Sequence, residues 1–254
     1  MDFPVERTAV VTGAASARGI GRALASRLAA AGWAVAVLDL DPGACESLAA
    51  ELTTRHGVPA LGIAADVTDR ASVDAALRAV EGGLPPVVAL ANVAGIASPT
   101  PFLEETDEGW DRVLAVDLRG VFVVTQRVLA GMVERRVGRV VSVSSVSAQR
   151  GGGTYSKVAY SAAKAGVIGF TRALAREVGP SGVTVNCVAP GPVDTDIMGG
   201  ALDEERRVAL SRDTMLGRVG TVEDVAALMA FLLGSESGWI TAATYDVNGG
   251  LQVS

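Results

Sequence analysis

The chain has 254 residues, of which 49% are hydrophobic and 20% charged, and its 28 acidic and 22 basic side chains give a net charge of −6. A negative chain without a stripe of Lys and Arg repels nucleic acid and anionic lipid, so we expect neither a nucleic-acid partner nor a membrane partner. One histidine and two cysteines are too few for a zinc site or a disulfide framework, so we expect no metal and a cytoplasmic location.

Short β-branched runs alternate along the chain with longer segments rich in Ala and Leu. The runs predict strands at 8–11, 34–38, 61–64, 87–90, 140–143, 183–188 and 244–247. The longer segments predict helices at 20–31, 43–55, 70–80, 108–133, 159–178 and 223–233. Near-continuously apolar strands are typical of a parallel sheet covered on both faces. The alternation therefore predicts an α/β fold, with one domain over residues 1–254 and a doubly wound parallel sheet of about seven strands.

A glycine-rich turn, from Thr12 to Gly21, follows the first predicted strand and opens the first helix. Glycines let the backbone turn tightly and approach a pyrophosphate, whose charge the N-terminus of a helix stabilises. A plain strand-to-helix turn is the alternative, because glycine patterns alone are common. Strand, glycines and helix come here in the order that dinucleotide binding requires, so the turn predicts such a site.

Asp39 ends the second predicted strand, 18 residues after Gly21. A carboxylate there accepts both hydroxyls of the adenosine ribose and repels a 2′-phosphate. Arg18 favours NADP instead, because a guanidinium in the glycine turn could pair with the 2′-phosphate. We give the Asp39 carboxylate more weight, so the sequence predicts NAD as the cofactor rather than NADP.

Tyr160 and Lys164 are four residues apart in a predicted helix, which places both side chains on one face. The positive charge of the ammonium favours phenolate and lowers the pKa of the tyrosine from its usual value near 10. The alternative is an aromatic residue and a lysine on a solvated face, which fits less well downstream of a glycine turn. Tyr155 lacks such a partner, because Lys157 follows it by only two residues.

These segments together resemble the short-chain dehydrogenase/reductase family, in its branch of about 250 residues, over essentially the whole chain. Further matching segments are Asp66-Val67, Asn92-Val93-Ala94-Gly95 and the Pro-Gly segment 190–195. The resemblance implies a Rossmann fold and a homotetramer, in which the small side chains of Ala163, Ala173 and Ala175 would permit close packing between copies. It implies cofactor binding by Gly13, Arg18, Gly19, Ile20, Gly21, Asp39, Asp66, Val67, Asn92, Ala94, Gly95, Tyr160, Lys164, Pro190, Gly191, Val193 and Thr195.

By the same resemblance, Tyr160 is the general acid/base and Lys164 holds the nicotinamide ribose. A serine on the fifth strand should orient the substrate oxygen. Counting forward from that strand gives Ser145, whereas counting back from the tyrosine gives Ser147. We favour Ser145, because the register of a strand varies less than the length of a glycine-rich loop.

The sequence departs from the family pattern in two places. Five residues separate Gly13 from Gly19, where the family has three, so the turn must bulge. Asp117 occupies the position of an asparagine that helps to kink the fourth helix. Its carboxylate could still form the kink, and could pair with Lys164 at longer range or be neutralised by Arg119 or Arg112.

The sequence thus predicts an NAD-dependent oxidoreductase that interconverts a secondary alcohol and a ketone. Segments 96–103, 146–157 and 196–216 carry few fixed charges, which indicates a small neutral substrate, and the irregular stretch 194–220 is interpreted as a lid with one short helix. The first alternative is an NADPH-dependent 3-oxoacyl-acyl-carrier-protein reductase, for which the basic cluster Arg135, Arg136 and Arg139 could dock the carrier. The second alternative is a catalytically silent dinucleotide-binding module.

Overall fold

The computed structural model describes residues 3–253, where nine α-helices surround one parallel sheet. The strands are β1 (Thr8–Thr12), β2 (Ala34–Asp39), β3 (Ala60–Ala64), β4 (Val87–Asn92), β5 (Gly138–Val143), β6 (Val183–Pro190) and β7 (Thr244–Val247). They pair in the order β3-β2-β1-β4-β5-β6-β7. The predicted strands are confirmed, and most extend one or two residues further than expected.

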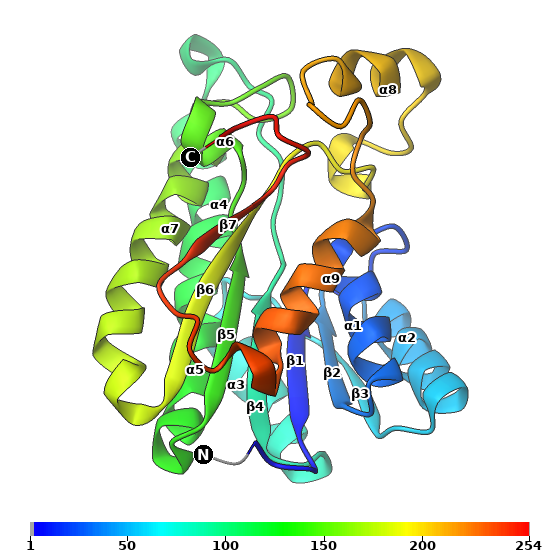
Figure 1. The fold of residues 1–254 in the computed structure, drawn as a ribbon, viewed down its shortest axis with the longest axis vertical. Coiled ribbons are helices and arrows are strands. Elements are labelled where there is room, and N and C mark those ends of the chain that lie inside the picture. The colour runs from blue at the N-terminus through cyan, green and yellow to red at the C-terminus, as the bar shows by residue number, and fades with distance from the viewer. Residues whose placement is uncertain (1–2, 254) are drawn as a thin grey trace.

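The helices form two layers, one on each face of the sheet. They are α1 (Ile20–Ala30), α2 (Pro42–His56), α3 (Arg70–Gly83), α4 (Asp107–Leu114), α5 (Gly120–Arg135), α6 (Ser147–Arg150), α7 (Val158–Val178), α8 (Glu204–Ser211) and α9 (Val222–Leu233). Helices α1, α2 and α9 share one apolar cluster with the sheet, and α3, α5 and α7 share the other (Figure 1). This arrangement confirms the doubly wound α/β fold.

Helix ends follow the local chemistry of the sequence. Helix α2 begins where the Asp41 carboxylate accepts a hydrogen bond from the Ala44 amide at 3.0 Å, and it ends at Gly57, whose φ is +68°. Helix α9 begins with a reciprocal capping box between Thr221 and Asp224. Within residues 3–253, no helix combines the length and the apolar character that crossing a membrane requires.

The predicted helix at 108–133 is divided in the structure. Helix α4 ends at Leu114, a π-helical turn spans Ala115–Arg119, and α5 continues from Gly120. The widened turn carries Asp117, which is fully buried. The prediction of one continuous helix is therefore wrong, whereas the kink that the resemblance implies at the position of Asp117 is present as this π-helical turn.

Gly62 in β3 lies against the backbone of α2, and a Cβ atom there would overlap the carbonyl oxygen of Cys45. We expect Gly62→Ala to lower the free energy of unfolding by about 1–3 kcal/mol, because backbone on both sides resists the extra methyl group. A fall in the urea midpoint without a change in slope would show this. Gly82→Ala is the matched control: no atom lies within 4 Å of its added Cβ, and alanine there should stabilise α3 by about 0.5–1 kcal/mol. Equal effects of the two substitutions would contradict the prediction.

Candidate active site

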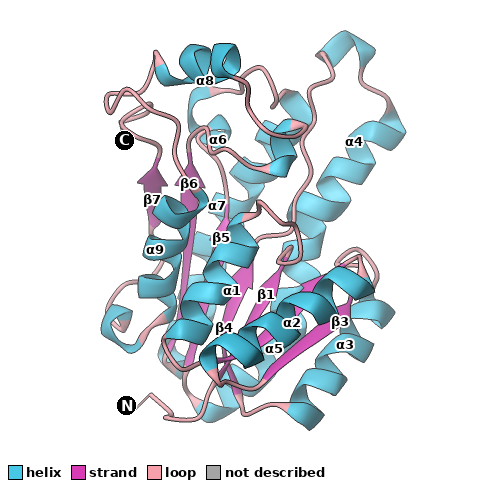
Figure 2. Ribbon diagram, turned by 90° about the vertical axis from the view of Figure 1, so that its right-hand side faces the viewer, coloured by secondary structure: helices cyan, strands magenta, loops and turns pink. Residues whose placement is uncertain are grey.

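A cavity of about 980 Å³ lies where the carboxyl ends of the strands meet, beside the reversal of strand order between β1 and β4. Figure 2 shows α8 beyond this same edge of the sheet, in the direction of the strand arrows. Crevices at such a reversal are where doubly wound sheets bind ligands. The predicted site residues that line it are Gly13, Gly19, Ile20, Asp39, Asp66, Val67, Ala94, Gly95, Ser145, Tyr160, Lys164, Pro190, Gly191, Val193 and Thr195.

Three predicted cofactor-binding residues lie outside the cavity lining. Asn92 is buried in β4, where its amide nitrogen donates to the hydroxyls of Thr125 and Ser142 at 3.0 and 3.1 Å. Gly21 lies beneath the glycine turn, and a Cβ atom there would overlap the carbonyl oxygen of Gly13. Arg18 is paired with Asp194 and lies beside Asp196, which does line the cavity. Asn92 and Gly21 therefore shape the site from behind instead of facing it.

The glycine turn packs closely on the loop after β4. Gly13 has a φ of +64°, and a Cβ atom there would lie 2.7 Å from the backbone nitrogen of Ala94. The hydroxyl of Thr12 accepts hydrogen bonds from the Val93 and Ala94 amides at 3.1 and 3.2 Å. Sequence reasoning assigned no role to this threonine. Gly13, Gly19 and Ile20 line the cavity at the start of α1, where a phosphate could approach, so the residues present fit a dinucleotide.

Asp39 connects the end of β2 to the glycine turn. One carboxylate oxygen accepts a hydrogen bond from the Ala15 amide at 2.9 Å, and the other accepts one from the Leu40 amide at 2.8 Å. These backbone donors fix the carboxylate at the cavity wall. Its position agrees with the sequence prediction of a ribose-binding acid.

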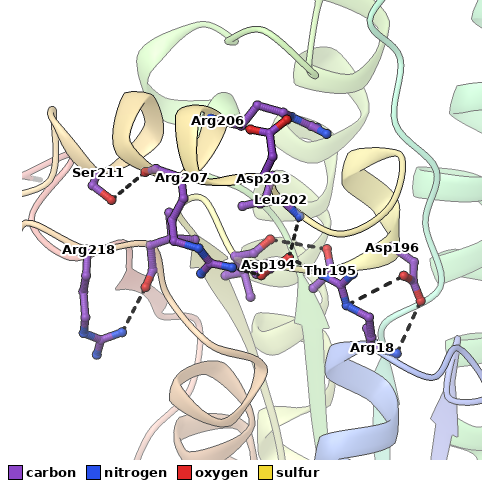
Figure 3. Close-up of polar contacts among 12 residues, drawn as sticks. Arg18, Asp194, Thr195, Asp196, Leu202, Asp203, Arg206, Arg207, Ser211 and Arg218 are labelled. Atoms are coloured by element: carbon purple, nitrogen blue, oxygen red, sulfur yellow. Dashed lines mark hydrogen bonds and ion pairs between the residues drawn. The ribbon is translucent and has the colours of Figure 1, made fainter.

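Arg18 and Ser16 of the glycine turn contact the segment after β6. The Arg18 guanidinium pairs with Asp194, and the Ser16 hydroxyl donates to Asp196 at 2.7 Å. Arg207 of α8 also binds Asp194, at 2.6 Å. Figure 3 shows Arg18 and Arg207 converging on this acidic pair from the two sides. We call Ser16, Arg18, Asp194, Asp196 and Arg207 the bridging cluster.

Ser145, Tyr160 and Lys164 meet at the centre of the cavity wall. Ser145 lines the cavity with Tyr160 and lowers the pKa of its phenol, and the Lys164 ammonium lies 5.5 Å from the centre of the tyrosine ring. Lys164 is 2% exposed and donates to the carbonyl of Val143 at 3.1 Å. Ser147 lies apart, because its hydroxyl is 2.7 Å from that of Ser156. Of the two serines considered, Ser145 is therefore the one beside the phenol.

Burial raises the pKa of Tyr160 above its ordinary value. The Lys164 ammonium acts in the direction predicted from the sequence and lowers it, but the Asp117 carboxylate opposes the ammonium. For Lys164 itself, burial disfavours the charge, yet Asp117 and Tyr160 outweigh burial and raise its pKa. The expectation of a lowered tyrosine pKa is thus wrong for this structure, since burial and a carboxylate outweigh the ammonium.

Asp117 makes a direct ion pair rather than the long-range one expected. Its Oδ2 atom lies 3.2 Å from Nζ of Lys164, and its Oδ1 atom accepts a hydrogen bond from the Ile96 amide at 2.9 Å. Arg119 does not neutralise it, because that guanidinium donates to the carbonyl of Thr68 at 2.5 Å. The π-helical turn brings the carboxylate to the lysine.

The remaining cavity wall is more charged than predicted. The three predicted substrate segments contribute to it, as do Arg112 of α4 and Leu251, which sequence reasoning missed. Arg150 and Asp213 both line the cavity, with their charged atoms 3.9 Å apart. The cavity therefore combines apolar side chains with fixed charges, and a purely neutral substrate does not follow from its lining.

Two surface interpretations need correction. Arg135 and Arg136 are exposed and donate to the carbonyls of Val87 and Pro180, whereas Arg139 is buried, so at most two of the three guanidinium groups could meet a carrier. The cluster also lies at the amino edge of the sheet, opposite the cavity. Ala163 and Ala175 are buried within their own chain, so only Ala173 of the three alanines is exposed to a second copy.

Comparisons with known proteins agree on one family. Residues 13–252 match the family model described as enoyl-(acyl carrier protein) reductase. A short-chain type dehydrogenase/reductase of Sinorhizobium fredii, y4mP, is 42% identical over 97% of this chain and 98% of its own. The 3-oxoacyl-(acyl-carrier-protein) reductase of Escherichia coli is 37% identical over 96% of this chain and 97% of its own.

A solved structure supports the same assignment. The crystal structure of the 3-oxoacyl-(acyl-carrier-protein) reductase of Brucella melitensis superposes with a TM-score of 0.90, at 33% identity, over 98% of this chain and 92% of that one. Family model, relatives and fold thus coincide over nearly the whole length. The chain belongs to the short-chain dehydrogenase/reductase family and is an oxidoreductase that acts on CH–OH or keto groups.

Proposed function

We propose that this oxidoreductase reduces a ketone to a secondary alcohol, and reverses that reaction, at the phenol of Tyr160. The observation that carries the proposal is the convergence of Tyr160, Ser145 and the buried Lys164 on one cavity, with the Lys164 ammonium 5.5 Å from the centre of the tyrosine ring. The nicotinamide dinucleotide, when bound, supplies or accepts the hydride. A silent module fits less well, because these side chains meet in one cavity.

In this proposal each of the three side chains has a distinct task. Tyr160 gives its proton to the carbonyl oxygen in reduction and takes it back in oxidation. Ser145 donates a hydrogen bond to the same oxygen and orients it. Lys164 holds the ribose hydroxyls of the dinucleotide and counters the negative charge of the phenolate.

For the substrate, the relatives favour the alternative from the sequence, the 3-oxoacyl group. Several relatives that match 96% of this chain bear the name of 3-oxoacyl-(acyl-carrier-protein) reductase. The direct test compares kcat/KM for acetoacetyl-coenzyme A with that for a simple methyl ketone of similar length. A clear preference for the thioester supports a 3-oxoacyl substrate, whereas equal or lower activity on it overturns that part of the proposal.

For the cofactor, the geometry favours NAD(H), because the Asp39 carboxylate lines the cavity and Arg18 is paired with Asp194. We expect kcat/KM to favour NADH over NADPH, and Asp39→Ser to reduce that ratio by about 10–100-fold, or 1.4–2.8 kcal/mol. Asp41→Ser is the matched control, because it removes a charge two residues away while serine still caps α2. A preference of the unmodified protein for NADPH would contradict the prediction and support the NADPH-dependent alternative.

The remaining expectations belong to the same proposal. We propose that the cavity-lining glycines and the residues after β3, β4 and β6 hold the dinucleotide, and that segment 194–220 covers the substrate. Within that segment, Ile197 and Leu210 line the cavity. A homotetramer and a cytoplasmic location stay predictions, and light scattering at micromolar concentration tests the first.

A further inference from the structure

Asp117 is buried at a place where a neutral side chain would satisfy the same geometry. Its carboxylate is fully buried, with one oxygen on the Ile96 amide at 2.9 Å and the other 3.2 Å from Nζ of Lys164. An asparagine could accept the same backbone hydrogen bond without adding a charge. The charge of Asp117 therefore needs an explanation apart from the shape of the π-helical turn.

The consequence of that charge falls on Lys164 and, through it, on Tyr160. In a buried setting, opposite charges 3.2 Å apart largely cancel each other's effect on a third group. The groups that act on the Tyr160 phenol are the Lys164 ammonium, the Asp117 carboxylate and the Ser145 hydroxyl. The other charged residues that line the cavity are Asp39, Asp66, Arg112, Arg150, Asp196 and Asp213.

We propose that Asp117 is a positioning residue that neutralises Lys164 and thereby keeps Tyr160 a proton donor over a wider pH range. The inference rests on the proposed function, because it assigns Tyr160 the proton transfer. In reduction, the carbonyl carbon accepts a hydride from the reduced dinucleotide, while the carbonyl oxygen accepts the phenolic proton. The phenolate then regains a proton from water, so atoms and charge balance.

The pH dependence follows from these roles. Reduction needs the protonated phenol, so kcat/KM for the ketone falls as the pH rises through the pKa of Tyr160. Oxidation needs the phenolate, so kcat/KM for the alcohol rises through the same range. Removing a nearby negative charge favours the phenolate, so Asp117→Asn should move both limbs to lower pH by about one unit.

The experiment measures the phenol directly as well as the reaction. Tyrosinate absorbance near 295 nm is titrated in the protein without cofactor, for the unmodified chain and for Asp117→Asn. The same titration with Tyr160→Phe in each background isolates Tyr160 from Tyr155 and Tyr245. Asp111→Asn is the matched control, because it removes an exposed charge from α4 and should move neither the titration nor the pH profile.

Each outcome supports or overturns the proposal. A downward shift of the Tyr160 titration and of both limbs in Asp117→Asn supports it. An unchanged titration overturns it, even if activity falls, because activity loss alone indicates a structural role. If instead Tyr160→Phe keeps full activity, the proposed function fails, while the titration still reports the effect of Asp117. Thermal unfolding and dinucleotide binding confirm that each variant is folded.

Discussion

Tyr160→Phe is expected to lower kcat for carbonyl reduction by about 1,000-fold, while dinucleotide binding stays nearly unchanged. The variant keeps the aromatic ring and loses only the phenolic hydroxyl. Transfer of a proton by a positioned group contributes about 10²–10⁴-fold to the rate, and phenylalanine has no proton to give. A continuous assay of the absorbance of the reduced cofactor measures the rate, and quenching of protein fluorescence measures dinucleotide binding.

Tyr155→Phe is the matched control for this prediction. Tyr155 lines the same cavity, but its ring lies under the guanidinium of Arg206, 4.8 Å from its centre, rather than beside Lys164. We expect a change of less than about tenfold, or 1.4 kcal/mol, in kcat/KM. A larger loss for Tyr155→Phe than for Tyr160→Phe would contradict the assignment of the acid/base role to Tyr160.

Lys164→Met is expected to lower the free energy of unfolding of the cofactor-free protein by about 3–5 kcal/mol. Methionine fills much of the volume of the lysine but leaves the fully buried Asp117 without its ammonium partner. Breaking a buried ion pair by removing one member strands the other charge in a medium that solvates it poorly. Urea unfolding followed by circular dichroism measures the loss.

The double variant Lys164→Met with Asp117→Asn separates the stranded charge from other effects. Because asparagine removes that charge, we expect the double variant to recover most of the lost stability. Lys157→Met is the control, since Lys157 is the only other lysine of the chain and is partly exposed. A loss at position 164 that the double variant does not recover would show that the ion pair is not its cause.

Much of the fold could be predicted from the sequence because the apolar runs of a doubly wound sheet are local signals. The runs in β1 and β4, for example, are buried on both faces, and a proline pair precedes the second of them. The helical pattern of residues 108–133 is equally regular, yet the chain widens into a π-helical turn at Ala115–Arg119. The resemblance implies a kink at Asp117, but the ion pair of that residue with a lysine 47 positions later is contained in no local pattern.

The site was partly predictable for the same reason. The spacing of Tyr160 and Lys164 is a property of one helix, α7, so the sequence predicts their shared face. The choice between Ser145 and Ser147 depends on how the short helix α6 leaves β5, which is a tertiary feature. Arg18 shows the limit most clearly, because its partner Asp194 lies 176 positions away in the chain. Sequence patterns could predict neither that partner nor the resulting loss of a free guanidinium.

The bridging cluster links the binding of the dinucleotide to the movement of the segment that follows β6. Ser16 and Arg18 belong to the turn where the dinucleotide is expected, whereas Asp194, Asp196 and Arg207 belong to the segment beside the substrate region. A ligand that binds Arg18 must compete with the Arg18–Asp194 ion pair, and breaking that pair frees the segment after β6 to move. Thermodynamic reciprocity requires the converse: the ion pair weakens binding of the ligand by the same factor by which the ligand weakens the ion pair. The strength of the Arg18–Asp194 pair therefore determines how strongly the two ligands are coupled.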